Sequence, residues 1–206
     1  MAYAYLDVRL DGPVARVTLN RPDVRNAFNA EMIGELTDVF ASLGRERALR
    51  AIVLSGSGSA FCAGGDVHWM RASLDLDEAG NLNDALRLSD MYRAIDRCAK
   101  PVVARIHGAA LGGGAGLAAV ADIAVASEDA SFGFTETKLG IIPAIISPFV
   151  IAKIGQSQAR ALFLTGERFS AARALAIGLV HHAAPAHDLD LICLLYTSPS
   201  PRDRQK

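Results

Sequence analysis

The sequence predicts an α/β fold built on a largely parallel sheet. Short apolar runs resemble buried strands, the segments between them carry apolar residues at helical spacing, and the two kinds of segment alternate along the chain. Parallel strands need a long crossover connection, usually a helix, so this alternation is typical of a parallel sheet. A length of 206 residues suits one domain with one core.

The chain is expected to begin with a β-hairpin. Residues 5–10 and 14–19 alternate apolar and polar side chains, as half-buried strands do. Asp11 and Gly12 between them favour a tight turn. The first two strands are therefore expected to be antiparallel neighbours.

Two longer segments have helical periodicity. The first covers residues 29–44, with Asn29 as the expected N-cap and Gly44 as the expected stop. The second covers residues 81–100 and is expected to end before Pro101, because the residue preceding a proline is disfavoured in a helix. The acidic stretch before it, residues 71–83, is expected to be a solvated loop.

Buried strands are expected at three apolar segments, residues 50–56, 101–106 and 123–127. Residues 170–185 are expected to form a helix, a stop at Gly178 and a further strand.

The C-terminal segment differs in composition from the rest. Residues 193–206 read CLLYTSPSPRDRQK, which is rich in Ser, Pro and Arg and has no evident period. We therefore assign the domain to residues 1–186 and interpret residues 187–206 as a disordered or non-native tail. A natural tail and a sequencing or cloning join are both open explanations.

Composition and net charge limit the classes of binding partner and the location that we expect. The net charge of −1 gives no general attraction to nucleic acid or to an anionic membrane. Cys62, Cys98 and Cys193 lack metal-ligand spacing, so no metal site is expected. Neither a signal peptide nor a membrane-spanning apolar stretch is visible, and the expected location is the cytoplasm.

Two glycine segments follow predicted strands. Residues 64–66 and 112–114 each lead into a predicted helix, where backbone N–H groups lack intrahelical partners. Two such turns could direct two N–H groups at one oxygen and form an oxyanion hole. Close helix packing explains either segment alone equally well. A dinucleotide site is disfavoured, because the spacing G-x-G-x-x-G is absent.

Glu136 is the candidate acid and base. It lies between Phe134 and the apolar residues 139–146, so its neighbours are expected to desolvate it and raise its proton affinity. Such a carboxylate suits general acid and base catalysis. The alternative is a surface glutamate paired with Lys138. His107 is interpreted as a satisfied core histidine, with a role in the pocket as the alternative. His68 would line either a pocket or the core.

Several segments together carry a family resemblance: NRPDVRNAFN, FCAGGDVHWM, HGAALGGGAGLA, ADIAVAS and FGFTETKLGIIP. Over residues 5–186 they resemble the crotonase (enoyl-CoA hydratase/isomerase) superfamily. The resemblance implies a crotonase-like core of repeated ββα units, with the C-terminal helical part truncated. Within the family, three further segments most resemble the bacterial methylglutaconyl-CoA hydratases: WMRASLDLDEAGNLNDA, IIPAIISPFVIAKIG and LTGERFSAARALAIGLVH. The chain is also similar to the hydratases of isohexenylglutaconyl-CoA.

The resemblance implies roles for three site residues. The N–H groups of Gly65 and Gly113 would form the oxyanion hole for a thioester carbonyl, and Glu136 would be the glutamate that the hydratases share. The chain departs from the two-glutamate hydratases at Gly116, where they carry a second glutamate. The methylglutaconyl subfamily is similar to this chain in lacking it.

Substrate-binding roles are implied for further positions. Arg25 would contact the phosphates of coenzyme A, and the backbone near Ala63 would contact the adenine. Trp69, on the helix expected after the first glycine turn, would either line the pocket or pack in the core. Lys138 or Arg71 could meet a distal carboxylate of the acyl group.

The implied reaction is hydration of an α,β-unsaturated acyl-CoA, foremost 3-methylglutaconyl-CoA to 3-hydroxy-3-methylglutaryl-CoA in leucine degradation. The alternative reactions are hydration of isohexenylglutaconyl-CoA or of a generic enoyl-CoA, and Δ3,Δ2-enoyl-CoA isomerisation. Two alternatives are not enzymes: an RNA-binding protein, which the net charge disfavours, and an inactive fragment. No cofactor is expected, since coenzyme A is part of the substrate. Family members assemble as trimers or dimers of trimers, and the 206-residue chain is expected to be poorly soluble or inactive without further C-terminal helices.

Overall fold

The computed structural model describes residues 3–197. Its strands are β1 (Leu6–Asp11), β2 (Val14–Leu19), β3 (Ala51–Gly56), β4 (Val102–Ile106), β5 (Ala109–Leu111), β6 (Ile123–Ser127), β7 (Ser131–Gly133), β8 (Arg168–Ser170) and β9 (His182–Ala184). Its α-helices are α1 (Ala30–Arg45), α2 (Val67–Ala72), α3 (Glu78–Asp96), α4 (Gly113–Val120), α5 (Ser147–Thr165), α6 (Ala171–Ala176) and α7 (Leu189–Thr197).

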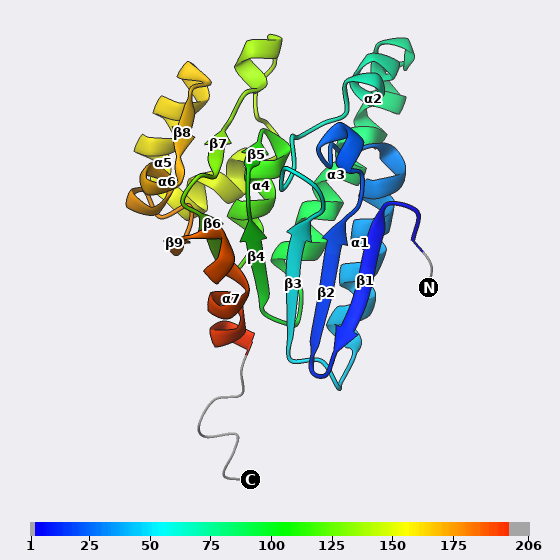
Figure 1. Ribbon diagram of the computed structural model, residues 1–206. Helices are drawn as coiled ribbons and strands as arrows, with labels where there is room; N and C mark the ends of the chain where they lie inside the picture. The colour runs from blue at the N-terminus through cyan, green and yellow to red at the C-terminus, as the bar shows by residue number, and fades with distance from the viewer. Residues whose placement is uncertain (1–2, 198–206) are drawn as a thin grey trace.

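The main sheet has the strand order β1-β2-β3-β4-β6-β9 (Figure 1). The hairpin β1–β2 is antiparallel, with Leu6 opposite Leu19, and every later neighbour in this sheet pairs in parallel. The predicted α/β architecture with a largely parallel sheet is therefore confirmed, as is the hairpin at its edge.

A second, three-stranded sheet has the order β5-β7-β8. The sequence did not indicate these strands, because each is only three residues long and too short to show a period. Strands β5 and β7 are parallel, with Leu111 opposite Gly133. Their carboxyl ends therefore lie side by side, and the residues that follow each strand become spatial neighbours.

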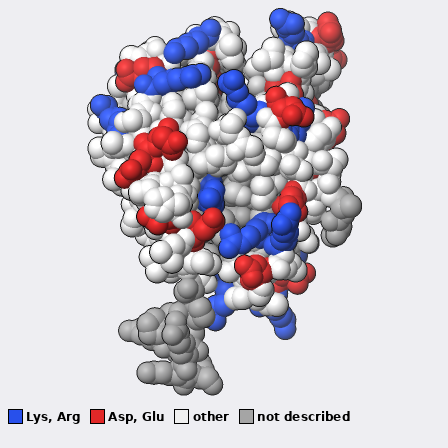
Figure 2. Space-filling view, viewed as in Figure 1, with Lys and Arg blue, Asp and Glu red and all other residues white. Residues whose placement is uncertain are grey.

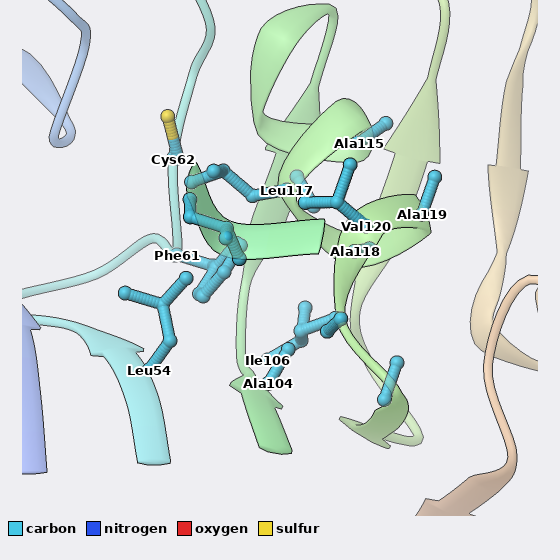
Figure 3. Close-up of a cluster of buried hydrophobic side chains, with 14 of the residues drawn as sticks. Leu54, Phe61, Cys62, Ala104, Ile106, Ala115, Leu117, Ala118, Ala119 and Val120 are labelled. Atoms are coloured by element: carbon cyan, nitrogen blue, oxygen red, sulfur yellow. The ribbon is translucent and has the colours of Figure 1, made fainter. Parts of the chain in front are cut away.

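The two faces of the main sheet bury different side chains, as the two-residue period of a strand requires. Ile52 and Leu54 of β3 face the main core, which contains side chains of α1, α3 and α4. Figure 3 shows Leu54 in one cluster with Phe61 and with residues of β4 and α4. Val53, between Ile52 and Leu54 in the sequence, faces the opposite side and packs with Leu189 of α7.

Helix α1 begins as predicted and ends differently. The side chain of Asn29 accepts a hydrogen bond from the Met32 N–H at 3.0 Å, so it is the N-cap. The prediction that Gly44 stops the helix is wrong, because α1 continues to Arg45. A Cβ atom on Gly44 would lie 3.4 Å from Sγ of Cys98, an ordinary van der Waals contact, so the packing does not require glycine at this position.

The segment before α3 is more ordered than predicted. Residues 71–83 were expected to form a solvated loop, but α3 already begins at Glu78. Asp77 caps this helix by accepting a hydrogen bond from the Gly80 N–H at 2.7 Å. The acidic residues therefore serve the start of a helix, whose partial positive charge they complement.

The predicted disorder from residue 187 is wrong for the part of the tail that the structure describes. Leu189, Cys193 and Thr197 are spaced four residues apart and are all buried on one side of α7. This helix covers Val53, Val103 and Val125 on the second face of the sheet. A stripe of three buried residues is enough to hold α7 in place, because the sheet supplies a complementary apolar surface. Residues 198–206 lie outside the described part of the chain.

On the face shown in Figure 2, acidic and basic side chains are interspersed, in keeping with the net charge of −1. Within residues 3–197, none of the helices is both long enough and apolar enough to span a bilayer. No group of three or more His, Cys, Asp or Glu side chains in that part of the chain is arranged to hold a metal ion.

Candidate active site

A cavity of about 280 Å³ lies at the carboxyl ends of β5 and β7. It is bounded by the glycine turn at Gly64, the start of α4, one side of α3 and the irregular segment 139–146. Its lining residues are mostly apolar: Phe28, Ala63, Gly64, Gly65, Trp69, Met70, Leu88, Tyr92, Gly112, Gly113, Thr135, Glu136, Leu139, Ile141, Ile142, Pro143, Ala144, Ile145 and Ile146. Glu136 is the only acidic or basic side chain among them.

The first glycine turn presents the N–H of Gly65. Phe28 forms a parallel bridge with Gly65, its N–H donating to the Gly64 carbonyl at 2.7 Å and its carbonyl accepting from the Asp66 N–H at 2.8 Å. In parallel pairing the bridged residue directs its own N–H to the opposite side. The N–H of Gly65 therefore points away from Phe28, and Gly65 lines the cavity.

A buried ion pair holds this turn. Asp66 caps α2 by accepting from the His68 N–H at 2.8 Å, and it meets Nη2 of Arg21 at 2.9 Å. Although burial raises the pKa of Asp66, the hydrogen bonds from His68 and Arg21 outweigh it and keep the pKa below its ordinary value. Arg21 also donates to the Ala27 carbonyl, so the Gly65 turn is fixed to the segment that precedes α1.

The second glycine turn presents the N–H of Gly113. Gly112 has φ of +50°, which favours glycine, and Gly113 is the first residue of α4. An N–H in the first turn of a helix has no intrahelical acceptor. The two turns approach closely, because a Cβ atom on Gly64 would lie 3.5 Å from the Gly113 nitrogen. The predicted pair of glycine turns therefore meets at one cavity.

Glu136 faces the second turn. It follows β7, Gly112 follows the parallel strand β5, and the Gly112 N–H donates to the Gly133 carbonyl at 2.7 Å. A Cβ atom on Gly112 would lie 3.3 Å from Oε1 of Glu136. The parallel pair β5–β7 thus brings together a carboxylate and a helix start that are 24 positions apart in the chain.

The environment of Glu136 favours its protonated form. Its Oε2 atom is buried and has no hydrogen-bond partner among the described residues. Burial raises the pKa of Glu136, as expected from its apolar neighbours. The alternative of a surface pair with Lys138 is not what the structure shows, since Glu136 lines the cavity and Lys138 is exposed beside Gly166.

The other predicted binding residues divide into two groups. Ala63 and Trp69 line the cavity, and the Trp69 indole donates to Asp84 at 3.1 Å. Arg25 and Lys138 do not line it. Arg25 nevertheless neighbours Ala63, whose N–H donates to the Arg25 carbonyl at 3.0 Å, so the two residues proposed to contact coenzyme A are adjacent.

The histidines lie outside this cavity. Nε2 of His107 is 2.9 Å from the Gly58 carbonyl, but the residue is only partly buried and its Nδ1 has no hydrogen-bond partner among the described residues, so the prediction of a core histidine is wrong. His68 lines a second cavity of about 340 Å³ together with Arg21 and Asp66. Arg71 is exposed in the last turn of α2.

Tyr92 and the segment 139–146 complete the cavity, and sequence reasoning assigned neither of them to it. Tyr92 is a fully buried residue of α3, and its contact with α4 depends on tertiary packing. The sequence indicates only that residues 139–146 are apolar neighbours of Glu136. Gly116 packs beneath both parts, because a Cβ atom there would lie 2.5 Å from Cγ2 of Ile146 and 3.1 Å from the Tyr92 hydroxyl. A side chain at this position would therefore have to displace Ile146 or Tyr92.

Comparison with known proteins identifies similar sequences and folds. Residues 9–194 match the family model described as Enoyl-CoA hydratase/isomerase, so the match extends past residue 186 into α7. An enoyl-CoA hydratase from Shewanella pealeana is 40% identical, and its crystal structure has a TM-score of 0.90 over 93% of this chain and 72% of that one. AtuE from Pseudomonas aeruginosa is 41% identical, with a TM-score of 0.90 over 93% and 75% of the two chains. Enoyl-CoA hydratase AKT6-1 from Alternaria alternata is 37% identical over 169 residues, which are 82% of this chain and 55% of that protein.

Proposed function

The chain belongs to the enoyl-CoA hydratase/isomerase family, and we propose on that basis that it adds water to the double bond of a 2-enoyl-CoA thioester. Membership confirms the predicted crotonase-like α/β core and supports an enzyme of the hydro-lyase type. The observation that carries the proposal is the position of Glu136, whose Oε1 faces Gly112 at the start of α4.

The reaction needs a site for developing negative charge. When water attacks Cβ of an enoyl thioester, an electron pair moves through the double bond to the thioester oxygen. In the proposed complex this oxygen accepts hydrogen bonds from the N–H groups of Gly65 and Gly113, which line the same cavity. Loss of one such donor typically lowers a rate by about 10² to 10³.

Glu136 supplies the proton transfers. As a carboxylate it removes a proton from the attacking water, and as the resulting acid it gives a proton to Cα, which restores the thioester carbonyl. The sum is addition of one water molecule, with Glu136 returned to its starting state. The raised pKa of Glu136, caused by burial, makes its carboxylate a stronger base for the first step.

The acyl group has two candidates. The sequence resemblance favours 3-methylglutaconyl-CoA, with Lys138 or Arg71 meeting its distal carboxylate. The cavity favours an uncharged enoyl group, because its lining among the described residues contains no Lys or Arg and already contains Glu136. A second carboxylate in that surrounding would be desolvated and repelled by Glu136 unless a cation reached it.

Double-bond isomerisation is the second candidate reaction. It moves one proton between two carbons, and one carboxylate beside an oxyanion site is enough for it. The presence of a single acidic side chain in the cavity is the observation that favours this alternative.

We also propose how coenzyme A is held and how the protein assembles. The family resemblance implies that Arg25 contacts the phosphates and that the Ala63 backbone contacts the adenine. In support, the Ala63 N–H donates to the Arg25 carbonyl, and Ala63 lines the cavity. The assembly proposed from the family resemblance is a trimer or a dimer of trimers, which light scattering would test.

The experiment compares four substrates at equal enzyme concentration: crotonyl-CoA, a 3-enoyl-CoA, 3-methylglutaconyl-CoA and isohexenylglutaconyl-CoA. Hydration of the 2-enoyl thioesters should be faster than double-bond migration in the 3-enoyl thioester, and the reverse ranking would assign an isomerase. If 3-methylglutaconyl-CoA is the best substrate, Lys138→Met or Arg71→Met should raise its KM and leave that of crotonyl-CoA unchanged. Absence of turnover with all four would refute the proposed function.

A further inference from the structure

Tyr92 makes an unusual polar contact at the proposed oxyanion site. This side chain on α3 is fully buried, and its hydroxyl donates to the Gly113 carbonyl at 2.8 Å. Burial raises the pKa of the Tyr92 phenol well above its ordinary value, with smaller contributions from Cys62 and Glu136. The phenol therefore stays protonated and acts as a hydrogen-bond donor.

The start of α4 needs such support. Gly112, Gly113 and Gly114 have no side chains to pack, and glycine has the largest backbone freedom to lose. The turn is held by the Gly112 N–H, which donates to Gly133, by the Gly116 N–H, which donates to Gly112, and by Tyr92. Of these three contacts, only that of Tyr92 is made by a side chain.

The ring of Tyr92 also connects the two glycine turns through Phe28. The rings of Phe28 and Tyr92 meet edge to face with centroids 6.4 Å apart. A Cβ atom on Gly113 would lie 2.6 Å from the Phe28 ring and 2.8 Å from the Tyr92 hydroxyl, so both rings abut this glycine. The Phe28 backbone bonds to Gly64 and Asp66 on either side of Gly65.

We infer that Tyr92 is a positioning residue, which with Phe28 holds the Gly113 N–H in register with the Gly65 N–H. The inference rests on the proposed function, in which both N–H groups bind the thioester oxygen. Tyr92 lines the cavity, but its hydroxyl donates to the Gly113 carbonyl, so we place its effect on the reaction at Gly113. Hydrogen bonds to a developing oxyanion depend strongly on donor geometry, so a small rotation of Gly113 lowers the rate without removing the donor.

The test compares Tyr92→Phe with Phe149→Leu. The first variant keeps the ring and removes the hydroxyl. The second changes the packing against the Tyr92 ring, whose centroid is 6.0 Å from that of Phe149, and keeps the hydroxyl. Phe149 does not line the cavity, so it controls for a general packing effect.

Two readouts separate positioning from stability. For hydration of crotonyl-CoA, Tyr92→Phe should lower kcat about ten- to hundredfold and leave KM within about twofold of wild type. This loss of rate is smaller than the loss expected when one hydrogen-bond donor to the oxyanion is removed completely. The second readout is the infrared carbonyl stretch of butanoyl-CoA labelled with ¹³C at the thioester carbon. Relative to the free ligand, this stretch should move to lower frequency when the ligand binds wild type or Phe149→Leu. It should move less when the ligand binds Tyr92→Phe. Only bound ligand shows this shift, so unfolded protein does not contribute.

An unchanged kcat in Tyr92→Phe, or a lowered kcat with the full carbonyl shift, would overturn the inference. So would an equal loss of the shift in Phe149→Leu. If the wild-type protein shifts the carbonyl but hydrates no substrate, the proposed reaction fails, and the shift alone still decides the role of Tyr92.

Discussion

Gly116 offers a quantitative test of the packing beneath the cavity. A Cβ atom at this position would lie 2.5 Å from Cγ2 of Ile146 and 3.1 Å from both Cε1 and the hydroxyl of Tyr92. Overpacking of a core costs about 1–3 kcal/mol, and three close contacts place Gly116→Ala in the upper half, at about 2–3 kcal/mol. Alanine in a helix interior gains about 1 kcal/mol over glycine. The net loss of unfolding free energy should be about 1–2 kcal/mol.

Urea unfolding monitored by circular dichroism measures this loss. The matched background is Ile146→Leu, which has no atom at the Cγ2 position, so Gly116→Ala should destabilise it less than it destabilises the wild type. A Gly116→Ala protein as stable as the wild type, or an equal loss in both backgrounds, would refute the packing argument. For the same reason Gly116→Glu should not raise the hydration rate, since a side chain at this position would displace Ile146 or Tyr92.

Three further predictions concern stability. Asp66→Asn should lower the free energy of unfolding by about 3 kcal/mol near pH 7, because it breaks the buried pair with Arg21. Since the pair depresses the pKa of Asp66, the stability of the wild type should approach that of the variant as pH falls below the ordinary value of 3.8. A difference in stability that does not depend on pH would contradict this. Glu136→Gln should raise the melting temperature near pH 7, since the raised pKa makes the ionised form costly, and the gain of about 1 kcal/mol or less should disappear below pH 4.5. Because α7 covers the sheet, Leu189→Ala should lower the free energy of unfolding in urea by about 2–3 kcal/mol. Leu195 is 69% exposed, so Leu195→Ala should change it by no more than about 0.5 kcal/mol. Equal effects of the two substitutions would count against this packing.

Features encoded within one segment could be predicted from the sequence. The N-cap of α1 needs only Asn29 and the apolar positions that follow it, and the hairpin needs only alternation around Asp11 and Gly12. The stripe Leu189 and Cys193 carries the same kind of signal for α7, but the Ser-Pro-rich residues after it concealed this signal.

Features created by contacts between segments could not be predicted in this way. Glu136 was predicted to be desolvated, yet its position opposite Gly112 depends on the pairing of β5 with β7, two strands of three residues. The bond from Tyr92 to Gly113 likewise depends on how α3 packs against α4. The resemblance to a family assigned the glycines and Glu136 together, whereas the residues alone left each with a structural alternative.

The most direct test of the proposed mechanism is the hydration rate of Glu136→Gln, measured with saturating crotonyl-CoA. Glutamine keeps the size of the side chain and cannot accept the proton of water, so kcat should fall by about 10² to 10⁴. Binding of butanoyl-CoA should stay within a few fold of the wild type. The same substitution at the exposed Glu128, which does not line the cavity, should leave both values unchanged. A Glu136→Gln protein that hydrates crotonyl-CoA at close to the wild-type rate would contradict the assignment of Glu136 as the acid and base.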